Sequence, residues 1–384
     1  MLIYLIAGEP SGDMLGARLM RALKEQNPEI KFKGVGGDNM QKEGLTSLFN
    51  ITDLAIMGLV EIIPSIPKVL KHIKNTLKDI IETKPDIVIT IDSWSFSARI
   101  HKALRKKNIN TIQMHYVAPQ VWAWKKRRAK TMYKYIDHLL TLFPNEPQYF
   151  TPYKLKTDFV GHPAIESSML TISTKDFKQK YNIPENKDIA LILPGSRHNE
   201  VANLLPTFLE AVDELKQKYD NLFFILPTVS TVENRVRNII KDYSSDILII
   251  NTQQERYQAS RLAKFAIAAS GTVALELAII KTPHLVCYKV PKLTAWIARH
   301  FTNIKYINLT NILLDKPIIP ELLQEDCNKD TITKIVEDLL NEKSALYQKE
   351  QDAFIELSQN LKVGELNPSK NAANIILNLI KDVK

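Results

Sequence analysis

Five short segments carry residues suited to sugar and phosphate chemistry, and each lies at the end of an apolar run. They are Gly8–Asp13, Ile91–Phe96, Tyr116–Trp124, Leu193–Arg197 and Ala269–Thr272. In parallel sheets, ligands bind at the carboxyl ends of the strands, where glycines let the backbone come close to them. The segments therefore predict a binding site that is built from loops between strands and helices.

Asp92 is a candidate general base, because it directly follows the apolar run Ile87–Ile91. A carboxylate at the end of such a strand faces the ligand and could accept a proton from it. The alternative is that Asp92 caps the following helix, and spacing alone slightly favours capping. Ser11 and Asp13 have the same two interpretations, with about even weight.

Two turns in the second half of the chain predict a site for a nucleotide diphosphate. Arg197 could contact a phosphate through two N–H groups, and a helix that begins near Thr272 would offer free N–H groups to an anion. Glu276, one turn into that helix, could reach a ribose diol. Two such turns in one unit favour a diphosphate-sugar nucleotide as the ligand.

Two other segments have an open interpretation. Trp122 and Trp124 precede the cations Lys125–Arg128. The tryptophans could stack on nucleic acid while the cations neutralise it. The alternative is a core-lining loop that leads into a basic helix start. The segment Met57–Lys71 mixes large aliphatic residues with prolines and lysines. Exposed, it would suit an anionic membrane surface; buried, it would be an ordinary loop and helix start.

The composition excludes several classes of protein. The chain has 384 residues, of which 45% are hydrophobic and 24% charged, so it is neither disordered nor a polytopic membrane protein. Lys and Arg number 51 against 42 Asp and Glu, a net charge of +9 that suits nucleic acid, anionic lipid or a phosphorylated substrate. Cys287 and Cys327 form no disulfide framework, which favours a reducing compartment. No metal-binding motif is present, and no cofactor is expected.

The elements that must position these loops alternate between short β-branched runs and longer amphipathic stretches. The predicted strands are 2–7, 31–35, 87–91, 111–116, 138–143, 159–160, 188–193, 222–226, 247–251, 265–269 and 283–288. The predicted helices are 12–26, 66–83, 97–107, 204–218, 272–280, 343–361 and 371–379. This alternation predicts parallel sheets with helices on both faces. The first run is interpreted as a strand and not as a signal peptide, and no stretch is long enough to span a bilayer.

The pattern restarts near Asp188, after the polar segment 173–187, which predicts two doubly wound units. We place the domains at residues 1–172 and 173–345, followed by helices over 346–384.

The order of the motifs resembles the lipid-A-disaccharide synthase family, the inverting glycosyltransferases of lipopolysaccharide biosynthesis. The strings that carry the resemblance are Gly8–Asp13, Met57–Glu61, Tyr116–Trp124, Leu193–Arg197 and Ser270–Thr272. The resemblance implies a GT-B fold, with two Rossmann-like domains facing a central cleft. The first domain would serve the acceptor and the membrane, the second would bind the UDP-sugar donor, and the C-terminal helices would pack back on the first.

The implied reaction joins UDP-2,3-diacylglucosamine to 2,3-diacylglucosamine 1-phosphate (lipid X) and releases UDP, with inversion to a β-1′,6 linkage. The resemblance also implies a protein that works without a metal, peripherally on the cytoplasmic face of the inner membrane, with an anionic membrane surface as a partner. It leaves room for a homodimer. The alternatives are another GT-B enzyme acting on UDP-sugars, such as an epimerase or a muramyl-lipid glucosaminyltransferase, and a basic nucleic-acid-binding protein.

The resemblance also assigns roles to individual residues. Asp92 would be the base that takes the proton of the acceptor 6-hydroxyl, and Arg197 would stabilise the leaving diphosphate. The implied donor-binding residues are Ser196, Ser270, Gly271, Thr272, Glu276, Asn311 and Gln324. The implied acceptor-loop residues are Glu9, Ser11, Gly12, Asp13, Met57, Glu61 and Trp122. The implied membrane contacts are Val60, Ile62, Ile63, Ile66, Val69 and Leu70.

The chain departs from the family pattern at three places. Thr310 replaces a proline in the stretch that carries Asn311, which we expect to loosen that loop. Cys287 replaces a glycine, which could narrow the pocket. Trp94 and Ser95 replace a proline and an acid after the base, which leaves Asp92 in place and puts the shape of its loop in question.

Overall fold

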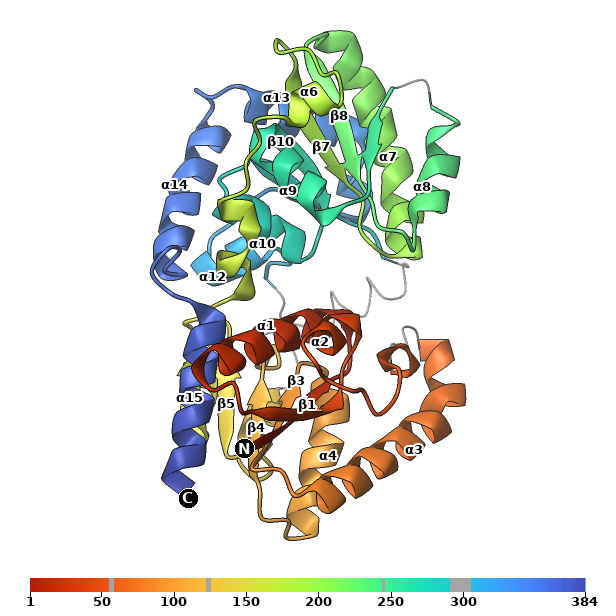
Figure 1. Ribbon diagram of the computed structural model, residues 1–384. Coiled ribbons are helices and arrows are strands. Elements are labelled where there is room, and N and C mark those ends of the chain that lie inside the picture. Colours follow the sequence, from red (N-terminus) through yellow and green to blue (C-terminus); the bar gives the residue numbers. More distant parts are fainter. Residues whose placement is uncertain (55–58, 122–125, 244–245, 291–304, 384) are drawn as a thin grey trace. The chain divides into compact units, whose positions relative to one another are not determined.

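The chain forms two sheets, each of six parallel strands (Figure 1). The computed structural model describes residues 1–54, 59–121, 126–243, 246–290 and 305–383. It describes only the backbone of Thr52, residues 59–66, Lys126 and Val383. The chain divides into two compact units, Met1–Pro163 with Gly364–Lys384, and Ala164–Val363.

The first unit contains a sheet with the strand order β2-β1-β3-β4-β5-β6, in which all neighbouring strands are parallel. Its strands are β1 (Leu2–Ala7), β2 (Lys31–Val35), β3 (Ile87–Ile91), β4 (Ile112–Tyr116), β5 (His138–Thr141) and β6 (Lys156–Phe159). Its helices are α1 (Pro10–Gln26), α2 (Asp38–Lys42), α3 (Leu59–Thr83), α4 (Trp94–Lys106), α5 (Ala129–Met132) and α15 (Pro368–Val383). Because β1 and β3 are mostly apolar and nearly all of their residues are buried, both faces of this sheet must be covered.

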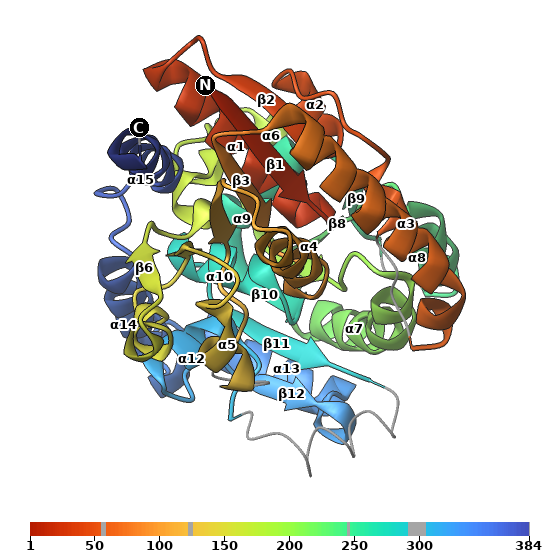
Figure 2. The ribbon, with the colours of Figure 1, turned by 90° about the horizontal axis from the view of Figure 1, so that it is seen from below.

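Helices α3 and α4 pack together and close one face of this sheet around Tyr4, Ile6 and Val88 (Figure 2). Helix α15 runs beside α1, which brings the end of the chain back to its first helix (Figure 1). This return confirms the expectation for the last helix.

The second unit has the strand order β12-β11-β10-β7-β8-β9, again with every neighbouring pair parallel. Its strands are β7 (Asp188–Leu193), β8 (Leu222–Pro227), β9 (Leu248–Ile250), β10 (Ala263–Ala269), β11 (His284–Tyr288) and β12 (Glu321–Leu323). Its helices are α6 (Phe177–Lys180), α7 (His198–Lys218), α8 (Glu233–Ile240), α9 (Gln253–Leu262), α10 (Thr272–Ile279), α12 (Leu309–Leu314), α13 (Lys329–Leu340) and α14 (Ala345–Asn360). Helices α7 and α13 pack on one face of the sheet, and α9 packs on the other.

The predicted fold class is confirmed, and the differences lie at the weakest sequence signals. Strand β12 has only three residues, and α9 is rich in Gln and Arg, so neither shows a clear apolar period. Helix α3 begins at Leu59 and not at 66, so that Pro64 and Pro67 both lie within the helix. In the part of the chain that the structure describes, no helix combines the length and apolar character needed to cross a bilayer.

The tail over 346–384 is divided between the two units. Helix α14 packs on α10, α12 and α13 of the second unit, and only α15 belongs to the first. The reason is a buried contact, since Glu350 of α14 accepts the backbone N–H of His284 at the start of β11 over 3.0 Å.

Candidate active site

Each sheet has one place where the strand order reverses, and four of the five segments singled out by the sequence lie there, while Tyr116–Trp124 follows β4. In the first unit the reversal falls between β1 and β3, whose carboxyl ends lead into Gly8–Asp13 and Asp92. In the second it falls between β7 and β10, which lead into Gly195–Arg197 and Ser270–Thr272. Such reversal points are where open α/β sheets bind ligands.

Asp92 lies in a turn with unusual backbone geometry. Asp92 and Ser93 have φ values of 57° and 43°, so two successive non-glycine residues are left-handed. The Asp92 carboxylate accepts the N–H of Ser93 over 2.8 Å and caps no later amide of α4. Strained turns of this kind persist where the surrounding structure holds them, often at functional sites. The geometry therefore favours a functional role for Asp92 over the capping role.

Burial and the neighbouring polar groups Ser93, Glu9 and Ser11 shift the pKa of Asp92. Burial raises the pKa of the Asp92 carboxyl, and the nearby Glu9 carboxylate raises it further, while the Ser93 N–H and the Ser11 hydroxyl oppose the rise. The Ser93 hydroxyl donates to Glu9 Oε1 over 2.7 Å, which ties the two loops together. Glu9, Ser11 and Asp92 thus form one cluster, and a raised pKa is what a carboxylate needs to act as a base near neutral pH.

Gly12 and Asp13 support this cluster in different ways. A Cβ atom on Gly12 would lie 3.2 Å from the carbonyl oxygen of Ile91, so a side chain there would push α1 away from β3. The Asp13 side chain is buried, and its two oxygens accept four hydrogen bonds from residues 37–40, between 2.7 and 3.0 Å. Asp13 therefore fixes the loop after β2, and its place among the acceptor-loop residues stays a prediction.

Trp94, one of the departures from the family pattern, lies directly after the Asp92 turn, at the start of α4. It is 8% exposed and packs against the His115 ring at a centroid distance of 4.8 Å. Below it, the Thr90 hydroxyl bonds both His101 and His115, over 2.8 and 2.6 Å. Burial lowers the pKa of both histidines, so they are neutral supports for the turn. The substitution replaces a proline by a packed aromatic side chain and leaves the turn well supported.

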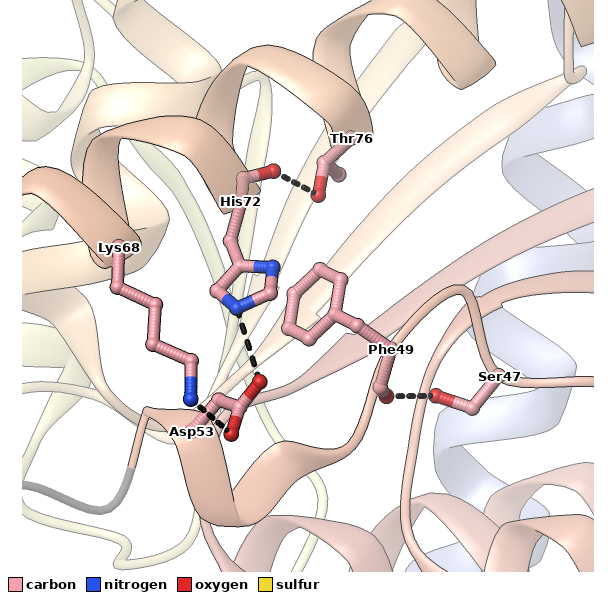
Figure 3. A network of polar contacts seen from close by, with 6 residues as sticks. All are labelled: Ser47, Phe49, Asp53, Lys68, His72 and Thr76. Atoms are coloured by element: carbon pink, nitrogen blue, oxygen red, sulfur yellow. Dashed lines mark hydrogen bonds and ion pairs between the residues drawn. The ribbon is translucent and has the colours of Figure 1, made fainter.

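A polar network anchors the first half of α3 to the loop before it (Figure 3). Asp53 accepts from Lys68 over 2.6 Å and contacts His72 Nε2 at 3.1 Å, and the His72 ring stacks on Phe49 at 3.9 Å. Of the expected membrane contacts on this helix, Val69 packs against the core of the unit, and Leu70 is 54% exposed.

Seven expected residues cannot be placed. Met57 and Trp122 lie outside the described residues, and the structure describes only the backbone of Val60, Glu61, Ile62, Ile63 and Ile66.

Arg197 lies at the start of α7 on an exposed loop of the second unit. Its side chain is 60% exposed and donates to Glu200 Oε1 over 2.6 Å, while Glu200 Oε2 accepts the N–H of Ser196. Gly195 has φ of 105°, and a Cβ atom there would lie 2.3 Å from Glu200. An exposed ion pair contributes about 0–1 kcal/mol, so a diphosphate could readily displace Glu200 and take the guanidinium.

The turn before α10 offers a second group of donors. Ser270 donates through Oγ to the carbonyl of Ile307 over 3.3 Å, while Gly271 and Thr272 are exposed. Among the described residues, and apart from Gly271 and its two chain neighbours, no atom lies within 4 Å of where a Gly271 Cβ would be. Glu276 faces Arg256 of α9, which donates to its Oε2 over 2.7 Å. This turn keeps the features that an anion-binding helix start needs.

Asn311 and Gln324 have structural roles in this conformation. The Asn311 amide is 1% exposed and makes four hydrogen bonds, to the backbone of Ile318 and Ile319 and to Glu321. Gln324 clamps Val290 by accepting its N–H and donating to its carbonyl, over 2.8 and 2.9 Å. Both amides are therefore hydrogen-bonded within the protein. In this conformation they could affect donor binding only by fixing the loops that they hold.

The other two departures, Thr310 and Cys287, both lie in the second unit. Thr310 donates its N–H to Asn308 Oδ1 over 2.7 Å, a bond that a proline lacks, so the loop carrying Asn311 is held and not loosened. Cys287 is fully buried in one apolar cluster with Cys327, and its effect on a binding pocket stays a prediction.

Among the described residues, no group of three or more His, Cys, Asp and Glu is placed to hold a metal ion. Three residues that hold the expected site residues in place were not predicted from the sequence. Glu200 lies three residues after Arg197, and this spacing is a signal from which their ion pair could have been predicted. Arg256 and Glu321 gave no local signal, because their partners lie 20 and 10 residues away.

Glu146 is a buried carboxyl at the carboxyl end of β5. It is 3% exposed and accepts the N–H groups of Leu142 and Phe143, each over 3.0 Å. Burial raises its pKa from 4.5 to about 7, against the effect of these two donors. Because the folded pKa is the higher one, this group stabilises the fold fully below pH 4.5, and that contribution is lost as the pH rises to about 7.

We expect Glu146→Gln to remove this pH dependence, because the amide oxygen can still accept and carries no charge. Thermal unfolding should show a flatter stability profile between pH 5 and 8 and a gain at pH 8 of at most about 3 kcal/mol. The exposed Glu210→Gln is the control. An unchanged slope in the Glu146 variant would contradict the assignment.

Solved structures similar to this chain identify its class. UDP-GlcNAc 2-epimerase from Neisseria meningitidis, bound to UDP-GlcNAc, aligns with a TM-score of 0.66 at 16% identity, covering 100% of both chains. A glycosyltransferase from Rickettsia africae aligns with a TM-score of 0.59 at 14% identity, covering 100% of this chain and 98% of that one. These likenesses show the fold, and two doubly wound units of this kind define a GT-B protein.

Sequence comparisons identify the family within that class. A family model described as lipid-A-disaccharide synthetase matches residues 3–376. Lipid-A-disaccharide synthase from Paramagnetospirillum magneticum is 43% identical over 387 residues, covering 100% of this chain and 99% of that protein. The enzyme from Rhodospirillum centenum is 41% identical, covering 99% and 95%.

The chain belongs to the lipid-A-disaccharide synthase family. It is a glycosyltransferase of lipid A biosynthesis whose substrates are lipid A precursors. This membership rules out the epimerase and nucleic-acid-binding alternatives.

Proposed function

We propose that the chain transfers the diacylglucosaminyl group of UDP-2,3-diacylglucosamine to the 6-hydroxyl of lipid X. The bond from O6 to the anomeric carbon forms as the bond from that carbon to the diphosphate breaks. Inversion then gives the β-1′,6 linkage of lipid A disaccharide 1-phosphate, and UDP leaves. The observation that carries the proposal is the left-handed Asp92 turn, with its half-buried carboxylate beside Glu9.

In this proposal Asp92 takes the proton of the 6-hydroxyl as the oxygen attacks. The raised pKa of Asp92 makes it a better proton acceptor than a solvated aspartate, and inversion needs a single base. Ser11 and Glu9 hold the cluster in place.

The second unit would bind the donor. Arg197 would leave Glu200 and stabilise the charge that develops on the diphosphate, the role of a metal ion in other transferases. The exposed turn at Gly271 and Thr272 would hold the phosphates, and Glu276 would contact the ribose.

The test is incubation of the protein with both lipid substrates and detection of the products by mass. The proposal predicts equal amounts of UDP and disaccharide 1-phosphate, formed only when both substrates are present. Conversion of the donor without lipid X would favour an epimerase or hydrolase activity instead.

We further propose that α3 binds the anionic cytoplasmic face of the inner membrane, so that the enzyme is peripheral there. Leu70 is 54% exposed, and Lys71 and Lys74 are exposed on the same helical face. The Asp53 network fixes this part of the helix to the body of the unit. An exposed aliphatic residue between cations is suited to a surface of anionic lipid.

We expect the triple variant Leu70→Ser, Lys71→Gln, Lys74→Gln to bind anionic vesicles at least about tenfold more weakly, since each cation near such a surface contributes about 1 kcal/mol. Co-sedimentation with phosphatidylglycerol vesicles measures this. The control is Lys334→Gln with Lys343→Gln, two exposed lysines of the second unit. Equal sedimentation of the triple variant and the unmodified protein would contradict the proposal.

A further inference from the structure

An enclosed ion pair joins the first turn of α9 to α10. Arg256 donates through Nη1 to Glu276 Oε2 over 2.7 Å, and the two side chains are only 24% and 17% exposed. The guanidinium also lies over the ring of Tyr257, with its carbon 4.8 Å from the ring centre. Burial lowers the pKa of Arg256, but the neighbouring Glu276 carboxylate raises it by more, and an arginine stays protonated in proteins.

The pair differs from the other arginine pairs of the second unit. Arg197–Glu200 and Arg237–Glu233 join residues of one helix end or turn, and both arginines are at least half exposed. Exposed pairs of that kind contribute little. Arg256 and Glu276 instead connect two helices, so the pair fixes the direction of the Glu276 carboxylate relative to the body of the unit.

The second oxygen of that carboxylate is left available. Among the described residues Glu276 Oε1 has no hydrogen-bond partner, while Oε2 is occupied by Arg256. Glu276 lies on the helix that starts at the exposed residues Gly271 and Thr272, and the described part of the chain leaves space at the Cβ position of Gly271. A carboxylate that is already held in one rotamer loses less entropy when it accepts a ligand hydroxyl, and a neighbouring cation offsets the cost of removing its water.

We propose that Arg256 is a positioning residue for the donor nucleotide, which holds Glu276 so that its free oxygen accepts a ribose hydroxyl of the UDP-sugar. The inference rests on the proposed function, because it requires the nucleotide to bind at the start of α10. It adds a residue that does not touch the ligand and that nevertheless sets how well the site distinguishes a ribose from a deoxyribose.

The test compares the binding of UDP, 2′-deoxy-UDP and 3′-deoxy-UDP by calorimetry. A site that uses a buried carboxylate to bind a hydroxyl rejects the analogue that lacks it, and one such hydrogen bond corresponds to about tenfold or more in affinity. We expect the unmodified protein to show this preference for UDP over at least one deoxy analogue. Glu276→Gln should reduce the preference strongly.

Arg256→Ala should reduce the preference to the level of Glu276→Gln, and the double variant should show no further loss. Arg256→Lys should restore part of it, and it also serves if the alanine variant fails to fold. In turnover, Arg256→Ala should raise KM for the donor severalfold with kcat nearly unchanged. Arg237→Ala, which breaks the exposed pair on α8, should leave all three affinities unchanged.

The outcomes separate the inference from the function on which it rests. If Glu276→Gln keeps the preference of the unmodified protein, the carboxylate does not contact the ribose, and the proposed donor site is wrong. If Glu276→Gln loses the preference while both Arg256 variants keep it, the donor site stands and the role of Arg256 is overturned. A uniform loss of affinity for all three nucleotides in the Arg256 variants would also overturn that role, because it indicates only structural support.

Discussion

Asp92→Asn should fold normally and lose disaccharide synthesis by a factor of about 10²–10⁴, the usual contribution of a general base. Asparagine keeps the oxygen that accepts the Ser93 N–H, and it tolerates the left-handed φ of 57° at this position. The turn should therefore survive while the proton acceptor is lost. Release of UDP in the presence of both lipid substrates measures the effect.

The matched control is Asp220→Asn, an exposed aspartate of the second unit that should leave turnover unchanged. The pH profile gives a second check. A base must be ionised, and the pKa of Asp92 is raised, so turnover should fall on the acid side at a higher pH than for an ordinary aspartate. Near-normal turnover of the asparagine variant would exclude Asp92 as the base.

Arg197→Ala should have the second largest effect, a loss of about 10²–10³ in kcat, the range for removal of one charge-stabilising donor. Its side chain is 60% exposed and its pair with Glu200 lies on the surface, so stability should change by less than about 0.5 kcal/mol. A large loss of rate in a protein of unchanged stability would identify a contact made during the reaction.

Two variants accompany this measurement. Arg197→Lys keeps the charge and loses the planar fork of donors, so it should recover only part of the rate. Arg235→Ala removes an exposed arginine from α8 and should have no effect. If Arg197→Ala raised only KM, with kcat unchanged, the side chain would bind the donor without stabilising the leaving group.

The sheets and the loops at their carboxyl ends could be predicted from the sequence. Strands such as Leu2–Ala7 and Ile87–Ile91 are continuous apolar runs, a pattern that local side chains alone produce. The positions of Asp92, Arg197 and Ser270 follow from where those runs end. The motif order then predicted the family, which the comparisons confirm.

What each polar side chain does could not be predicted, because its partners lie far away in the sequence. Asp13 binds the backbone of residues 37–40, and the Asn311 amide is used up within its own loop. Arg256 carries no local signal, because its partner Glu276 lies 20 residues away on another helix. A motif fixes the type of a residue at a loop, while the remaining elements decide whether it faces a ligand or the protein.

One measurement tests most directly whether the chain uses Asp92 to join two lipid A precursors. The unmodified protein and Asp92→Asn are each incubated with UDP-2,3-diacylglucosamine and with either lipid X or a lipid X analogue that lacks the 6-hydroxyl, and the products are identified by mass. We predict disaccharide 1-phosphate and UDP only from the unmodified protein with lipid X. Disaccharide formed by the asparagine variant at a comparable rate, or from the analogue, would contradict the account.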